Sequence, residues 1–367
     1  MAITPQIFRG IIRQSKISTA IRYAHQDVAV RAIQFSRLTR QRLLADPAAL
    51  EKLQQKTGLA DLYWQALYYK SDDQDPTLAG AINEADGYVF FLHGWSGSHR
   101  IWENLPIELT ARSRRIVCFN LDVNGFGLSP FLKDPPDADQ CSPKALMMAV
   151  EHWLAAINLW PAVRPGPKPF YLFVGHSMGG AALFYKEEAG WRNEAYGLYA
   201  LAPALLHNDV QRQNFYKTLG LGIRLPSFSM VKNALAPRVI DILGTGASAE
   251  VKSDHLRVFS KTPFGTIART AYAMGSLATR PRRFDWGRFR VALGDADRLV
   301  GLNTMRELLT DFSLGPDQIR ILPGDHYFFS YGDNSPKAHR ENRKIILNDL
   351  LDLCQGLTEE AKQAAAG

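Results

Sequence analysis

A serine flanked by glycines is the strongest chemical signal in this sequence. Ser177 is the central residue of a Gly-His-Ser-Met-Gly segment that runs from Gly175 to Gly179. The apolar run before it predicts a buried strand and the Ala-rich run after it predicts a helix, which places the serine on a sharp turn. Such a turn is strained and needs small neighbours, which the two glycines provide. A serine held there above a helix N-terminus could act as a nucleophile; the alternative is a glycine-rich turn whose serine only caps the helix.

Attack by a serine on an acyl carbon also requires N–H donors aimed at the oxygen that becomes negatively charged. One predicted donor is the N–H of Met178, the residue after the nucleophile. The second is the N–H of Trp95, in the loop His93-Gly94-Trp95 that follows an earlier apolar run. His93 is interpreted as a structural residue that ties this loop by hydrogen bonds. A metal pair of His93 with His99 lacks a third ligand at suitable spacing, so no metal is expected. Acyl transfer through a serine needs no organic cofactor, so none is expected either.

The elements that must position these residues alternate along the chain. Short apolar runs predict strands at about 87–92, 115–121, 169–174, 195–201, 289–293 and 317–322. Amphipathic stretches between them predict helices at about 99–112, 143–160, 178–190, 301–313 and 336–355. This alternation is typical of a doubly wound, mostly parallel α/β sheet with helices on both faces.

The alternation stops between residues 204 and 285. This segment shows no clear sheet strand but is rich in apolar and aromatic residues. A segment so long and so apolar is unlike a structureless loop. It is interpreted as a helical insertion over the sheet.

The first 60 residues form a basic arm with a different pattern. Apolar residues recur at spacings of three and four over 7–12 and over 17–35, which predicts one or two helices. These helices would pack on the body of the protein. Two alternatives are peripheral membrane contact through residues 1–45 and an organelle-targeting segment.

Composition and charge exclude several classes of protein. The chain has 367 residues, of which 46% are hydrophobic and 22% charged, as in folded globular proteins. No apolar run approaches the roughly 20 residues that span a bilayer. The whole formal charge of +7 lies in residues 1–45, so the neutral remainder has no electrostatic reason to bind nucleic acid. Three scattered cysteines and a start without an apolar secretory signal favour a cytoplasmic location, with membrane association as an alternative.

Residues 87–330 resemble the α/β-hydrolase fold, in its group of esterase- and lipase-like serine hydrolases. The resemblance rests on His93-Gly94, on the Gly-His-Ser-Met-Gly-Gly segment, and on the stretch from Asn120 to Ser129. That stretch is similar to the family's Asp-x-Arg-Gly-x-Gly-x-Ser turn, but Asn124 stands where the family has arginine. The salt bridge made by that arginine is therefore not expected here.

The resemblance also implies the acid and the base of a catalytic triad. The family's acid follows a late strand, and the spacing in Gly294-Asp-Ala-Asp selects Asp297, with Asp295 as the second choice. The base follows the last strand, which selects His326. The chain order of serine, aspartate and histidine is the order expected for this fold.

The implied organisation is a basic helical arm (1–60), an α/β-hydrolase core (61–203 and 286–360) and an inserted helical cap (204–285). The implied activity is cleavage of a carboxylic ester through a Ser-His-Asp triad and an acyl-enzyme. The substrate would be a small acyl compound with an apolar portion. Thioesterase, amidase and acyltransferase activity use the same triad and stay open, as does a non-catalytic ligand receptor of this fold.

Overall fold

The computed structural model describes the chain in segments. The described ranges are 15–23, 26–35, 47–60, 62–70, 78–161, 168–224, 226–277, 280–281, 285–332 and 335–366.

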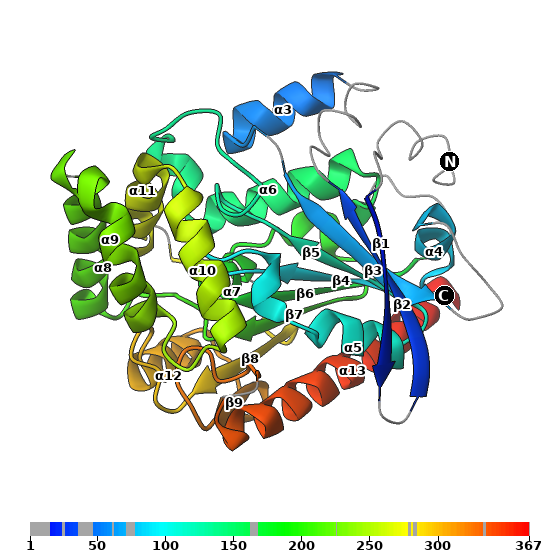
Figure 1. The fold of residues 1–367 in the computed structure, drawn as a ribbon. Coiled ribbons are helices and arrows are strands. Elements are labelled where there is room, and N and C mark those ends of the chain that lie inside the picture. Colours follow the sequence, from blue (N-terminus) through cyan, green and yellow to red (C-terminus); the bar gives the residue numbers. More distant parts are fainter. Residues whose placement is uncertain are drawn as a thin grey trace.

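Within these ranges, nine strands form one sheet in the order β1-β2-β3-β5-β4-β6-β7-β8-β9 (Figure 1). Strands β4 to β9 are parallel, and β3, β2 and β1 extend the sheet antiparallel beyond β5. The bounds are β1 (Ser15–Tyr23), β2 (Gln26–Phe35), β3 (Trp64–Lys70), β4 (Gly87–Leu92), β5 (Ile116–Leu121), β6 (Phe170–His176), β7 (Tyr196–Leu201), β8 (Phe289–Gly294) and β9 (Ile319–Leu322). The predicted doubly wound, mostly parallel sheet is confirmed.

Helices cover both faces of the sheet. In Figure 1, α6 and α7 lie on one face, and α5 and α13 lie on the other. Because both faces are covered, every residue of β4, β5, β6 and β7 is buried, which explains their nearly continuous apolar sequences. The core helices are α3 (Pro47–Thr57), α4 (Leu78–Glu84), α5 (Leu105–Arg112), α6 (Pro143–Ala156), α7 (Met178–Leu183), α12 (Leu302–Asp311) and α13 (Lys337–Ala366). Short 3-10 turns are η1 (His99–Trp102), η2 (Ala138–Cys141), η4 (Ala189–Trp191) and η5 (Pro316–Gln318).

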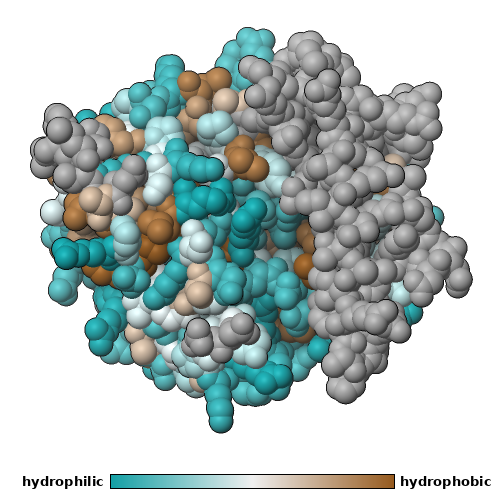
Figure 2. All heavy atoms as spheres, in the orientation of Figure 1, coloured by the Kyte–Doolittle hydropathy of each residue, from teal (hydrophilic) through white to brown (hydrophobic). Residues whose placement is uncertain are grey.

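A helical segment is inserted between β7 and β8, where the sequence predicts one. It consists of α8 (Val210–Ile223), α9 (Pro226–Leu243), α10 (Ala249–Lys261) and α11 (Phe264–Gly275), at the left of Figure 1. Apolar residues gather on the outer surface of this side of the molecule (Figure 2). Val210, Phe215 and Leu221 are among the exposed ones. In the described part of the chain, no helix is both long and apolar enough to cross a membrane.

The prediction of helices over residues 17–35 is wrong. The structure has an antiparallel hairpin there, in which β1 pairs with β2 and β2 pairs with β3. The β-branched residues of this stretch suit a strand as well as its spacing suits a helix, and the open edge of β3 offers hydrogen bonds that a helix would leave unmade. Strand β3 itself was not predicted. The apolar pattern at 7–12 lies outside the described residues.

Two further boundaries differ from the predictions. The last helix, α13, continues to Ala366 instead of ending near residue 355. The helix predicted from residue 178 to 190 ends at Leu183. The residue at which a helix ends is hard to predict from local sequence pattern, because fraying and tertiary contacts determine whether the last turn forms.

Removal of the hairpin should expose the edge of β3, which pairs with residues 29–35 of β2. We expect a variant without residues 1–45 to melt at a lower temperature and to associate as its concentration rises, since β3 would present unpaired N–H and C=O groups. Differential scanning fluorimetry and size-exclusion chromatography measure these two effects. A variant without residues 1–14 keeps both strands and is the control. Equal melting temperatures for both variants and the full chain would show that the pairing contributes no stability.

Candidate active site

Ser177 occupies the turn between β6 and α7 in a left-handed conformation, with φ 53° and ψ −115°. A non-glycine residue held in such a region costs about 1–3 kcal/mol, so the surroundings must enforce it. The N–H of Ser177 donates to the carbonyl of Leu201 at 2.9 Å. Its own carbonyl accepts from the N–H groups of Ala181 (2.8 Å) and Ala204 (2.9 Å). These bonds to α7 and to the chain after β7 hold the turn in place.

Glycines let the backbone around Ser177 pack closely. A Cβ on Gly179 would lie 2.3 Å from the carbonyl oxygen of Leu92, and one on Gly175 would lie 2.4 Å from the carbonyl oxygen of Gly179. A Cβ on Gly94 would lie 2.8 Å from the Cβ of Ser177. Each of the three therefore occupies a position where any side chain would force the backbone apart.

His326 and Asp297 form a buried pair beside this turn. Nδ1 of His326 lies 2.8 Å from Oδ2 of Asp297. Oδ1 of Asp297 accepts from the N–H groups of Leu299 (2.8 Å) and Val300 (3.1 Å), which fixes the carboxylate. Burial raises the pKa of Asp297, but the attraction of His326 and these hydrogen bonds outweigh burial and hold the pKa below its ordinary value. The carboxylate is therefore ionised at neutral pH and able to orient the imidazole.

Asp295, the second candidate for the acid, does not contact His326 and instead connects two loops. It is exposed, and its Oδ1 accepts from the N–H of Gly324 at 2.8 Å. This contact ties the loop after β8 to the loop after β9. The structure thus brings His326 together with Asp297 and leaves Asp295 outside the pair.

Ser177 and His326 line the same small cavity, of about 20 Å³. Among the described residues, no hydrogen bond joins their side chains; in apo sites such contacts often tighten only when substrate binds. The remaining walls are Trp95, Ser96, Tyr216, Ile240, His255, Leu299 and Tyr327. The space suffices for about one water molecule, whereas small-molecule pockets measure about 300–1,000 Å³. Tyr216, Ile240 and His255 belong to α8, α9 and α10, so the inserted helical segment forms one side of this cavity.

Neither of the two predicted oxyanion donors has an acceptor among the residues that the structure describes. Met178 is the first residue of α7, where an N–H has no intrahelical partner. The N–H of Trp95 makes no hydrogen bond to any described residue. His93 holds the loop of Trp95, because its Nδ1 lies 2.7 Å from the carbonyl of Gly94 and its Nε2 accepts from the N–H of Val123 at 2.9 Å. The structural interpretation of His93 agrees with these contacts.

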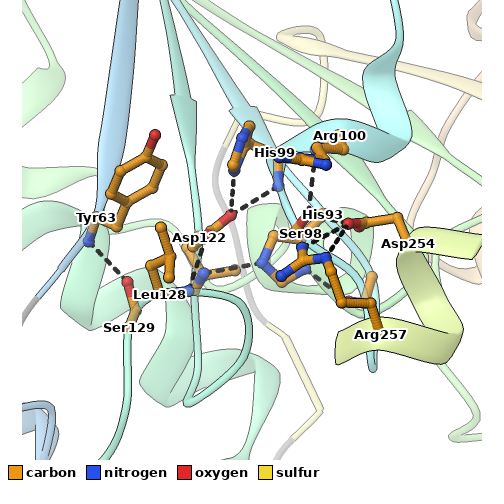
Figure 3. A network of polar contacts seen from close by, with 12 residues as sticks. Tyr63, His93, Ser98, His99, Arg100, Asp122, Leu128, Ser129, Asp254 and Arg257 are labelled. Carbon is orange, nitrogen blue, oxygen red and sulfur yellow. Dashed lines mark hydrogen bonds and ion pairs between the residues drawn. The ribbon is translucent and has the colours of Figure 1, made fainter. Parts of the chain in front are cut away.

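Asp122 organises the turn that resembles the family's arginine-containing motif (Figure 3). It is fully buried, and its Oδ1 accepts from the N–H of His99 at 2.7 Å and lies 2.8 Å from Nδ1 of the same residue. Its Oδ2 accepts from the N–H of Leu128 at 2.8 Å. Burial raises the pKa of Asp122, but the attraction of His99 and His93 and the hydrogen bonds from His99 together outweigh burial and hold the pKa below its ordinary value. Asn124, in place of the arginine, donates to the carbonyl of Cys141 at 3.0 Å and makes no salt bridge.

Sequence reasoning missed several residues of the cavity or its rim, among them His176, Tyr216 and His255. His176 is buried beneath Ser177, and its Nε2 donates to the carbonyl of His326 at 3.0 Å. Tyr216 and His255 reach the cavity from α8 and α10. The position of His176 inside the serine motif was a usable signal; nothing in the local sequence marks the other two, since the inserted helices bring them to the site.

No cation site accompanies the cavity. Across the described ranges, no three His, Cys, Asp or Glu side chains gather closely enough to hold a metal ion. His93 and His99 are both engaged in the hydrogen bonds described above.

The site combines three features: a strained serine after a parallel strand, a His–Asp pair on the loops after two later strands, and two N–H groups without an acceptor among the described residues. These features occur together in α/β enzymes that act on acyl groups. Residues 89–338 match the family described as "Alpha/beta hydrolase family". The match covers more than half of the chain, and the protein belongs to this family. Membership supports hydrolase activity. No curated protein sequence matches the chain.

Solved structures of similar fold have little sequence identity to this chain. An esterase from Exiguobacterium antarcticum has a TM-score of 0.54 at 11% identity, over 80% of this chain and 96% of its own. A thermophilic esterase from Thermogutta terrifontis has a TM-score of 0.52 at 15% identity, over 81% and 94%. A laboratory-evolved variant of a potato epoxide hydrolase has a TM-score of 0.53 at 13% identity, over 82% and 97%. At these identities the likeness shows the fold alone.

The pairing of His326 predicts unequal effects for the two aspartates. Asp297→Asn should lower kcat by up to about four decades, because the amide leaves the imidazole in the wrong tautomer. Asp295→Asn should lower it by less than about tenfold, since it affects only the contact with Gly324. Ester hydrolysis by both purified variants, with circular dichroism as the folding control, tests this ranking. An inverted ranking would assign the acid to Asp295.

Proposed function

We propose that the protein is a serine hydrolase that cleaves carboxylic esters through Ser177, His326 and Asp297. The observation that carries the proposal is the 2.8 Å contact of His326 with Asp297 next to a left-handed serine that faces the same cavity. A buried His–Asp pair alone is common as a structural contact. Its position beside a strained serine and two N–H groups without acceptors supports a catalytic role.

The first half of the reaction forms an acyl-enzyme. Nε2 of His326 removes the hydroxyl proton of Ser177, and Oγ forms a bond to the acyl carbon of the ester. The N–H groups of Trp95 and Met178 stabilise the negative oxygen of the tetrahedral intermediate. When the intermediate collapses, the carbon–oxygen bond to the alcohol breaks and His326 gives its proton to that alcohol. Asp297 holds the imidazole and stabilises its cation throughout.

The second half releases the acid. A water molecule loses a proton to His326 and bonds to the acyl carbon through its oxygen. The bond from Ser177 Oγ to that carbon then breaks, and the proton returns to Oγ. The carboxylic acid leaves, and the protein is restored without any change of oxidation state.

The walls of the cavity favour an acyl group with an apolar portion. Trp95, Ile240 and Leu299 supply apolar surface next to Ser177. The same triad would serve a thioester, an amide or acyl transfer to an alcohol. A panel of p-nitrophenyl esters and acyl thioesters of graded chain length separates these substrates.

Replacement of the nucleophile tests the proposal directly. Ser177→Ala should abolish ester hydrolysis, with a loss of several decades in kcat, because removal of one triad member removes the acyl-enzyme route. The melting temperature should not fall, since alanine keeps the same turn and loses only a hydroxyl that faces the cavity. Kinetics on the panel, together with scanning fluorimetry, measure both.

A fluorophosphonate probe provides the control for specificity. It should label the native protein at Ser177, and the Ser177→Ala variant should stay unlabelled. Retention of more than about a tenth of the activity by this variant would place the nucleophile elsewhere. A native protein that is neither labelled nor active on any panel member would favour the non-catalytic receptor.

A further inference from the structure

Residues 94–97, which we call the oxyanion turn, are held in their conformation by contacts with other elements of the chain. Its backbone is closed by the N–H of Gly97, which donates to the carbonyl of Gly94 at 3.2 Å. Ser96 within it is left-handed, with φ 58°. A short turn that contains such a residue does not keep its shape by local preference, so neighbouring elements must restrain it.

The restraint comes from the inserted helices. Nδ1 of His255, on α10, lies 2.8 Å from the carbonyl oxygen of Ser96. Asp254, the preceding residue of α10, accepts from the hydroxyl of Ser98 at 2.5 Å and is itself held by Arg257 (Figure 3). The indole N–H of Trp95 donates to the hydroxyl of Thr270 on α11 at 2.9 Å. Two contacts from α10 and α11 thus hold the turn that carries one proposed oxyanion donor, and a third holds Ser98, the residue directly after it.

His255 also reaches the loop of the base. Its Nε2 lies 2.6 Å from the hydroxyl of Tyr327, which follows His326 directly in the sequence. The carbonyl of Ser96 can only accept, so Nδ1 of His255 carries the proton and Nε2 accepts from the tyrosine hydroxyl. Burial lowers the pKa of His255 to about 4, so this neutral tautomer persists at neutral pH.

Both ring nitrogens of His255 are therefore occupied, and the ring has no free position for a substrate or a proton transfer. It lies 4% exposed at the wall of the cavity, where it joins two loops that must keep a fixed distance during acyl transfer. We propose that His255 is a positioning residue: it fixes the oxyanion turn through Ser96 and couples that turn to the loop of His326 through Tyr327. The helical segment is then part of the catalytic scaffold as well as a cover. This inference rests on the proposed serine hydrolase function.

Three substitutions at residue 255 separate the two bonds. His255→Asn places an amide N–H near the former Nδ1 and keeps the bond to Ser96. His255→Gln places its amide near the former Nε2 and keeps only the contact with Tyr327. His255→Ala removes both. Tyr327→Phe removes one hydroxyl from the same link, and Tyr185→Phe is its matched control, because the hydroxyl of Tyr185 contacts Nε2 of His207 at 3.1 Å away from the cavity.

We expect His255→Ala and His255→Gln to lower kcat by about tenfold or more, below the roughly hundredfold loss that follows removal of an oxyanion donor itself. KM should change by less than about threefold, and His255→Asn should recover part of kcat, because it keeps the bond to Ser96 and loses the bond to Tyr327. The affinity of a boronic acid, whose tetrahedral adduct uses the oxyanion donors, should fall in parallel with kcat/KM. Tyr327→Phe should lower kcat more than Tyr185→Phe does.

Fluorophosphonate labelling and melting temperature are measured on every variant. A native protein that is not labelled contradicts the proposed function itself. If the native protein is labelled and active, three results would overturn the role of His255: an unchanged kcat in His255→Ala, a rise in KM alone, or a loss in His255→Asn equal to that in His255→Ala. If His255→Ala does not fold, two other comparisons of kcat test the role. Equal kcat values for His255→Asn and His255→Gln, or for Tyr327→Phe and Tyr185→Phe, would then overturn it.

Discussion

The close approach of two loops at the carboxyl edge of the sheet is the constraint on which the site depends. Strands β4 and β6 are parallel neighbours, with Leu92 paired to Gly175, so both chains leave the sheet at the same level. The absent side chain of Gly179 then lets the start of α7 lie against the carbonyl of Leu92. The turn of Ser177 and the turn of Trp95 can meet only because of this contact. The proposed nucleophile and its proposed oxyanion donors are therefore brought together by backbone packing.

A largely shielded ion pair between Glu103 and Arg343 joins the surrounding loops. Glu103 accepts from the hydroxyls of Ser248 and Ser330 and pairs with Arg343 of α13 at 3.1 Å. It thereby joins the turn after η1, the start of α10 and the loop that continues from His326. Loss of Glu103 would leave the charge of Arg343, which is 6% exposed, without this carboxylate partner. The order of the loops around the candidate site is in this way tied to the stability of the fold.

The candidate residues of the site could be selected from the sequence because local pattern marks them. Ser177, Asp297 and His326 each follow a short apolar run, and parallel strands bring the residues after their carboxyl ends to one edge of the sheet. The contact of His326 with Asp297 at 2.8 Å agrees with the choice made from spacing. The roles of these residues in catalysis stay predictions until activity is measured.

Contacts between residues far apart in the chain could not be predicted from local sequence pattern. The stretch from residue 17 to 35 satisfies both a helical spacing and a strand composition, and the free edge of β3 decides between them. His255 gives no local signal, because its importance arises from two loops that lie 159 and 72 residues away along the chain. The sequence by itself determined which residues could react and which short segments carry them. The tertiary structure alone decided which side chains hold those segments, since contacts between distant parts of the chain depend on how helices and strands pack and not on the neighbours of each residue.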